Sequence, residues 1–162
     1  MWAERSDLKR GWRLLLLWLP ALAYMAAIFW MSSRSDPIPG LRLVGGTDKI
    51  AHAAAYSLLG FLLARAFVGS FPTRGLVSMA LVGALVGTFY GVTDELHQTF
   101  VPGRHGNVFD VAANTLGAFL GASAFLVVAR YRRGSIVSTP DGGRAAAPNA
   151  GSGPAGGAGE GE

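Results

Sequence analysis

The polar residues of this chain that could do chemistry are gathered in three short segments and one loop. Within each segment they recur every four residues, a spacing that places side chains along one face of a helix. The first segment contains Asp48, Lys49, His52 and Tyr56, the second contains Tyr90, Asp94, Glu95 and Gln98, the third contains Asp110 and Asn114, and the loop before the third contains Arg104. The sequence around them is strongly apolar, so this concentration of polar groups indicates either a functional site or a set of contacts that hold the helix ends together.

These residue types allow two kinds of chemistry. His52 beside a carboxylate could act as a general acid/base pair. Arg104 and Lys49 could bind a phosphate or carboxylate, and the forked guanidinium suits both. His52 and the nearby carboxylates could also hold a divalent metal, but no ligand spacing demands one, so no metal site is predicted. The sequence has no cysteine, no nucleophile elbow, no His-x-x-Glu-His pattern and no phosphate-binding loop, so we expect no cofactor.

The elements that must position these residues are four long apolar segments. The chain is 51% hydrophobic and 15% charged, and charged residues are nearly absent from these four segments. About 20 helical residues cross a hydrocarbon core that is roughly 30 Å thick. The predicted spans are Trp12–Met31, Ile50–Val68, Gly75–Thr93 and Phe109–Ala129. The sequence therefore predicts an all-α protein, a four-helix transmembrane bundle that lies in the plasma membrane as a multi-pass protein.

The basic residues predict the orientation of the bundle. The N-terminal side, the loop between the second and third spans, and the C-terminal side contain most of the 14 lysines and arginines: Arg5, Lys9, Arg10, Arg13, Arg65, Arg74, Arg130, Arg132, Arg133 and Arg144. Because positive charge is enriched in cytoplasmic loops, both termini are predicted to be cytoplasmic. The net charge of +4 comes from residues that flank the spans, so we expect a lipid bilayer and no nucleic acid as a partner.

This orientation brings the three polar segments to one face of the membrane. The start of the second span, the end of the third and the start of the fourth all lie at the outer face. We therefore predict one outer pocket formed by His52, Asp94, Glu95, Arg104 and Asp110, with Asp48, Lys49, Tyr56, Tyr90, Gln98 and Asn114 as its supporting shell. The alternative is that these groups cap helices and tie three helix ends together without a pocket.

Glycines recur every four residues in two of the spans. The third span contains Gly83, Gly87 and Gly91, and the fourth contains Gly117 and Gly121. Small residues on one face allow helices in lipid to pack closely. We therefore expect the third and fourth spans to form a tight pair.

The sequence divides into three parts. Residues 1–11 are predicted to be a cytoplasmic N-terminal segment, and residues 12–133 are predicted to be the membrane domain. Residues 134–162 are rich in Gly, Ala and Pro and have few large apolar side chains. Such a segment cannot offset its ordering entropy by burial, so we predict a disordered cytoplasmic tail.

The polar motifs resemble those of the VanZ-like family, which is named for a protein linked to teicoplanin resistance. The matching stretches are DKIAHAAAY, YGVTDELHQTFVPGR and DVAANTLGAFLG, in this order and at the ends of spans. The similarity covers about Trp12 to Arg130. The family positions that the resemblance carries onto this chain are Asp48, Lys49, His52, Tyr56, Tyr90, Asp94, Glu95, Gln98, Pro102, Arg104, Asp110, Asn114, Gly117 and Gly121.

The resemblance implies a polytopic cell-envelope protein, of a type sometimes associated with resistance to glycopeptide antibiotics. Two functions remain open at this point. The outer pocket could bind a cell-envelope component, namely a cell-wall precursor, a lipid headgroup or a glycopeptide-related ligand. Alternatively, the protein could be a membrane-embedded acid/base enzyme, a hydrolase or transferase, that acts on a lipid-linked substrate. A lipid-linked cell-wall precursor and another membrane protein are the candidate partners besides the bilayer.

Overall fold

The computed structural model describes residues 2–35 and 47–137, and these residues form four α-helices and no strand. The helices are α1 (Trp2–Ser32), α2 (Thr47–Ser70), α3 (Leu76–Gln98) and α4 (Val108–Val137). Each contains a segment that is long and apolar enough to cross a membrane. The predicted all-α class and the four predicted spans are therefore confirmed.

The helix ends differ from the predicted boundaries. Helix α1 begins at Trp2, so the predicted N-terminal segment continues the first helix. Helix α4 runs to Val137, so the first four residues of the predicted tail, 134–137, are helical. The rest of the predicted disordered tail, from residue 138, lies outside the described residues.

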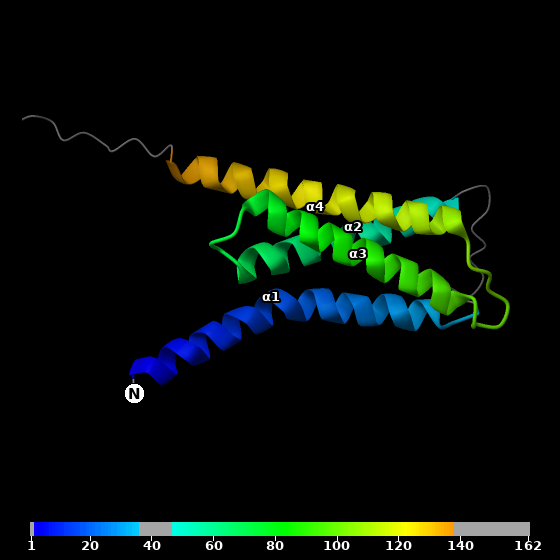
Figure 1. Cartoon of the computed structure of the whole chain (residues 1–162), viewed down its shortest axis with the longest axis horizontal. Coiled ribbons are helices and arrows are strands. Elements are labelled where there is room, and N and C mark those ends of the chain that lie inside the picture. Colours follow the sequence, from blue (N-terminus) through cyan, green and yellow to red (C-terminus); the bar gives the residue numbers. More distant parts are fainter. Residues whose placement is uncertain (1, 36–46, 138–162) are drawn as a thin grey trace, which may run out of the picture.

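The helices are arranged with α2 and α3 between α1 and α4 (Figure 1). The N-terminal end of α2, the C-terminal end of α3 and the N-terminal end of α4 lie at one end of the bundle. The N-terminal end of α1 and the C-terminal end of α4 lie at the opposite end (Figure 1). The three polar segments are therefore together at one end, as the alternation of four spans requires. We call this the polar end of the bundle.

Glycines bring α4 against α2. A Cβ atom added to Gly121 would collide with the backbone carbonyl oxygen of Ser57, and one added to Gly117 would collide with that of Ala53. From the opposite side, a Cβ at Gly60 would collide with the backbone carbonyl of Ala118. Close backbone approach of this kind is how helices associate where water supplies no hydrophobic drive. Gly117 and Gly121 therefore serve the α2–α4 contact and not the predicted contact of the third span with the fourth.

The glycines of α3 face both of its neighbours. A Cβ at Gly83 would lie 2.6 Å from the backbone nitrogen of Ala64 in α2. Cβ atoms at Gly87 and Gly91 would meet side chains, at 3.2 Å from Ala118 Cβ and 2.9 Å from Asn114 Cβ. Helix α3 does pack on α4 through these two glycines, although less closely than α2 does.

Most large apolar side chains of the bundle point outward, and several polar ones are buried. Phe89 and Val127 are 69% and 68% exposed, whereas Gln98 and Asn114 are 2% and 0% exposed. This distribution is the reverse of that in a water-soluble protein and suits a surface covered by lipid.

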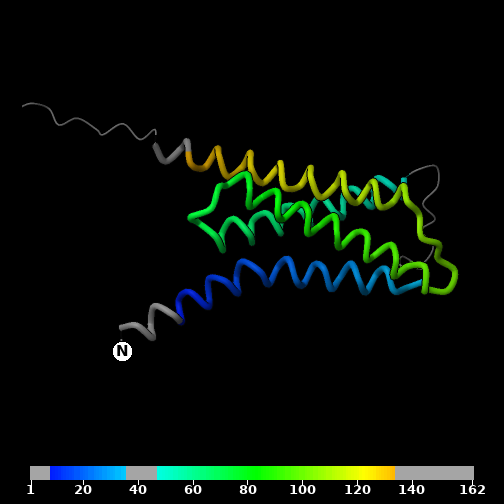
Figure 2. Tube along the Cα trace, viewed as in Figure 1, coloured from blue at the N-terminus to red at the C-terminus, as the bar shows by residue number. Residues whose placement is uncertain are grey.

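Helix α1 bends near its middle (Figure 2), where it contains Pro20. Proline lacks the N–H that would bond the carbonyl four residues earlier, here that of Leu16. The guanidinium of Arg65 in α2 donates to the carbonyl oxygens of Leu16 and Leu17 at 3.3–3.4 Å. Arg65, which lies near the end of its span, therefore donates to the Leu16 carbonyl that the proline leaves without a helical partner, and also to the neighbouring Leu17 carbonyl.

Candidate functional site

The structure divides the predicted polar cluster into two parts. One part ties the start of α2 to the start of α4, and the other surrounds a cavity between α1, α2, α3 and the α3–α4 loop. The first part contains Lys49, Asp110 and Asn114, and the second contains His52, Asp94 and Arg104 with three members of the predicted shell.

Lys49 connects two carboxylates in the first part. Its Nζ lies 2.9 Å from Asp48 Oδ2 and 3.2 Å from Asp110 Oδ1. The side chain of Asp110 is 12% exposed, so the lysine supplies the cation that a nearly buried carboxylate needs. His52 Nδ1 lies 3.0 Å from Asn114 Oδ1, which adds a second bond between the same helices. Asp110 and Asn114 therefore act as partners that tie α2 to α4, and neither lines the cavity.

Glu95 does not line the cavity either. Its Oε1 accepts a 2.7 Å hydrogen bond from the backbone N–H of Asn107, immediately before α4. The side chain of Asn107 in turn accepts from the backbone N–H of Phe109, as an N-capping residue does. Of the two adjacent acids, Glu95 fixes the start of α4, and Asp94 is the one that lines the cavity.

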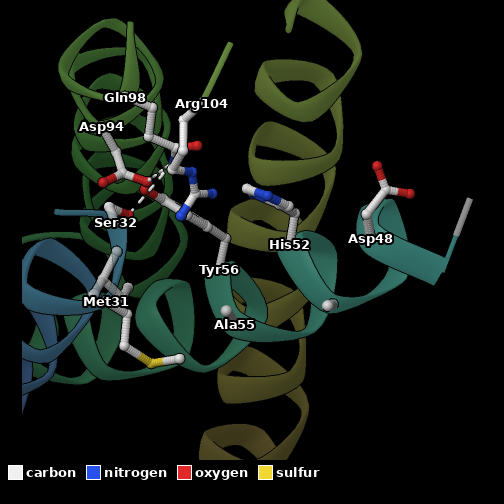
Figure 3. A pocket seen from close by; sticks show the side chains of 11 residues that line it. Met31, Ser32, Asp48, His52, Ala55, Tyr56, Asp94, Gln98 and Arg104 are labelled. Carbon is white, nitrogen blue, oxygen red and sulfur yellow. Dashed lines mark hydrogen bonds between the residues drawn. The ribbon is translucent and has the colours of Figure 1, made fainter. Parts of the chain in front are cut away.

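A tight turn carries Arg104 over the helix ends. The backbone N–H of Arg104 donates to the carbonyl of Val101 at 3.1 Å, and Gly103 has φ of 79°. Pro102 followed by a glycine at positive φ is the sequence of a type II turn. The turn directs the half-buried side chain of Arg104 towards the cavity, where Figure 3 shows it between Asp94 and His52.

The cavity has a volume of about 250 Å³ and mixes apolar walls with polar groups. The polar lining residues are Ser32, Asp48, His52, Tyr56, Asp94, Gln98 and Arg104, and the apolar ones are Ile28, Met31, Ala51 and Ala55. Three of the five predicted pocket residues, His52, Asp94 and Arg104, thus line one cavity at the polar end. Cavities that combine apolar walls with convergent polar groups are typical of binding sites for small ligands.

Three polar groups at the cavity lack a strong partner among the described residues. Asp94 is 4% exposed; its Oδ2 accepts from Gln98 Nε2 at 3.1 Å, and its buried Oδ1 has no partner. The hydroxyl of Tyr56, which is 1% exposed, also has none. Arg104 makes one long hydrogen bond, 3.5 Å to the carbonyl of Arg34, and no described carboxylate lies within 4.0 Å of its guanidinium. Buried polar groups are rarely left unpaired. Outside the cavity, Glu95 Oε2 and Asn114 Nδ2 are also buried without a partner among the described residues.

Helix α1 supplies a wall of the cavity that the sequence analysis did not assign. Ile28, Met31 and Ser32 line it, and the Ser32 hydroxyl accepts from Gln98 Nε2 at 3.5 Å. Tyr90, predicted to be part of the shell, lies outside the cavity and donates a 2.7 Å hydrogen bond to the carbonyl of Met25. The contribution of α1 to the cavity could have been predicted from the topology, because the end of the first span must lie at the same face of the membrane as the three polar segments.

The arrangement gives little support to an acid/base pair. Among the described residues, no carboxylate oxygen lies within 4.0 Å of a His52 ring nitrogen, and the partner of His52 is an amide. In the same part of the chain, no three His, Asp or Glu side chains are gathered in a way that could hold a metal ion.

Comparison with known proteins identifies the family of the chain. The model of the VanZ/LLP1 family matches residues 16–129, which include part or all of each of the four spans and both parts of the polar cluster. A search of curated proteins and a search of solved structures find no match. The family model covers well over half of the 162 residues. The chain is therefore a membrane protein with four helices able to span a bilayer, and it belongs to the VanZ/LLP1 family.

Proposed function

We propose that this VanZ/LLP1 protein binds the phosphate-bearing headgroup of a cell-envelope lipid in the cavity at its polar end. The observation that carries the proposal is Arg104, which lines the cavity and has no carboxylate partner among the described residues. Lys49, the other predicted anion-binding residue, is already engaged by Asp48 and Asp110. An arginine with free, forked donors in a largely apolar cavity is well suited to a phosphate group.

A lipid suits the cavity better than a water-soluble anion does. Ile28, Met31, Ala51 and Ala55 form apolar walls next to the polar groups. The helices around it have the length and composition of membrane spans. A ligand with a charged head and an apolar body matches both sets of contacts. Lipid-linked cell-wall precursors belong to this class, which is consistent with a connection between VanZ-like proteins and glycopeptide resistance.

Cross-linking tests the proposal. A diazirine-bearing aliphatic residue at position 28, which lines the cavity and is 9% exposed, should capture the ligand. The matched control is position 27, the exposed neighbour on the same helix. In vesicles of equal parts phosphatidylglycerol and an uncharged diglycosyl-diacylglycerol, position 28 should recover mainly the phospholipid and position 27 should recover both. Equal recovery of the two lipids at both positions would contradict the proposal.

We further propose that the polar end faces the outside of the plasma membrane, on the basis of the distribution of basic residues. Because the chain has no cysteine, single cysteines can report this directly. His105 and Thr73 are exposed in the loops at the two ends of the bundle. A membrane-impermeant maleimide should label His105→Cys in intact cells and Thr73→Cys only after permeabilisation. The opposite pattern would place the cavity at the cytoplasmic face.

A further inference from the structure

The cavity is lined by a cationic and an anionic side chain that do not form an ion pair with each other. Arg104 and Asp94 both line it, yet no oxygen of Asp94 lies within 4.0 Å of the guanidinium. Figure 3 shows the two side chains entering the cavity from different elements, Asp94 from α3 and Arg104 from the loop that follows it. Opposite charges held apart in one apolar cavity match a ligand that itself carries both charges.

The carboxylate of Asp94 indicates the chemistry of the positively charged group of such a ligand. A carboxylate that is 4% exposed and has only an amide partner lacks the cation that burial normally requires. The other acid of the lining, Asp48, already has Lys49 at 2.9 Å. Asp94 Oδ1 can only accept a hydrogen bond, whereas the Tyr56 hydroxyl can donate or accept one. A positively charged group with N–H donors would supply the cation that the carboxylate lacks and could also donate to the hydroxyl oxygen.

We infer that the ligand of this cavity carries a primary ammonium group beside its phosphate, which is the chemistry of phosphoethanolamine. The phosphate lies on the free donors of Arg104, and the ammonium donates to Asp94 Oδ1 and the Tyr56 hydroxyl. The apolar residues Ile28 and Met31 contact the part of the ligand that follows the phosphate. This inference rests on the proposed binding of a phosphate-bearing headgroup and adds the feature that selects among such headgroups.

Three short-chain lipids separate the two levels of the proposal. Titration of the purified protein in an uncharged detergent uses dihexanoyl phosphatidylethanolamine, phosphatidylcholine and phosphatidylglycerol. Phosphatidylcholine keeps the positive charge but has no N–H donor, and phosphatidylglycerol has the phosphate without the ammonium. The ethanolamine lipid should bind about tenfold more tightly than the choline lipid, because a charged hydrogen bond is lost in the latter.

Substitution of the acid tests the assignment to Asp94. Asp94→Asn should lower the affinity for the ethanolamine lipid to that for the choline lipid and leave the affinity for phosphatidylglycerol unchanged. The matched control is Asp110→Asn, the same change at a carboxylate that lies outside the cavity and already has a cation. It should preserve the preference for ethanolamine. Retained binding of phosphatidylglycerol also shows that each variant is folded.

The possible results test the ammonium group separately from the proposed phosphate site. If wild-type protein binds the ethanolamine and choline lipids equally, and still binds phosphatidylglycerol, the ammonium inference is overturned and the phosphate site stands. If none of the three lipids binds, the proposed function itself fails. Free phosphoethanolamine supports the same chemistry and identifies the source: equal affinity indicates a soluble ligand, and much weaker affinity indicates a lipid.

Discussion

Replacing Gly121 by leucine should strongly destabilise the bundle. Even a methyl group at this position would collide with the backbone carbonyl of Ser57, and the next nearest atoms, the Ser57 carbonyl carbon and the Phe61 nitrogen, would lie at 2.7 and 2.8 Å. Because these are backbone atoms, no side-chain rotation can relieve the contact, and α4 must move away from α2. Overpacking by single methylenes costs about 1–3 kcal/mol. We expect a leucine here to cost at least the upper value and to lower the melting temperature by roughly 10 °C or more.

Thermal unfolding in detergent measures this effect. The matched control is Gly11→Leu, the same substitution in a helix at a glycine whose added Cβ would have nothing within 4 Å. The control should melt close to wild type, and Gly121→Ala should fall between the two leucine variants. If Gly121→Leu and Gly11→Leu melt at the same temperature, the close α2–α4 contact described above is wrong.

The four helices could be predicted from the sequence because bilayer thickness sets the length of a span. Each apolar segment had to supply about 20 residues, and each such segment is a helix in the structure. The sequence also predicted that the three polar segments lie together, because successive spans cross the membrane in alternating directions and bring these ends to one face. The pairing of the helices could not be predicted. The spacing of Gly117 and Gly121 shows that one face of the fourth span carries only small residues, but it does not show which helix packs against that face.

The side-chain partners within the polar cluster were the part that sequence reasoning could not assign. Asp94 and Glu95 are adjacent and chemically alike, yet a helix turns about 100° per residue, so they face different surroundings. Asp94 lines the cavity, whereas Glu95 accepts from the start of α4. Lys49 and Arg104 are likewise both cations, and only the structure distinguishes the lysine that is engaged by two carboxylates from the arginine that is not.

Arg104 should therefore be dispensable for stability and necessary for binding. Its side chain makes only a 3.5 Å hydrogen bond to a backbone carbonyl among the described contacts, so its loss should change the free energy of unfolding by about 0.5 kcal/mol or less. Arg104→Lys keeps the charge but loses the planar fork that holds two phosphate oxygens. We expect this variant to bind dihexanoyl phosphatidylglycerol about tenfold more weakly, and Arg104→Ala to bind it at least as poorly.

The most direct test of a phosphate-binding cavity is the affinity of Arg104→Lys for this lipid, measured beside its melting temperature. The control is Arg74→Lys, the same exchange at an exposed arginine in the loop at the other end of the bundle. The proposal predicts that only Arg104→Lys loses affinity and that both variants melt like wild type. Unchanged affinity in Arg104→Lys, or affinity that falls only together with the melting temperature, would contradict it.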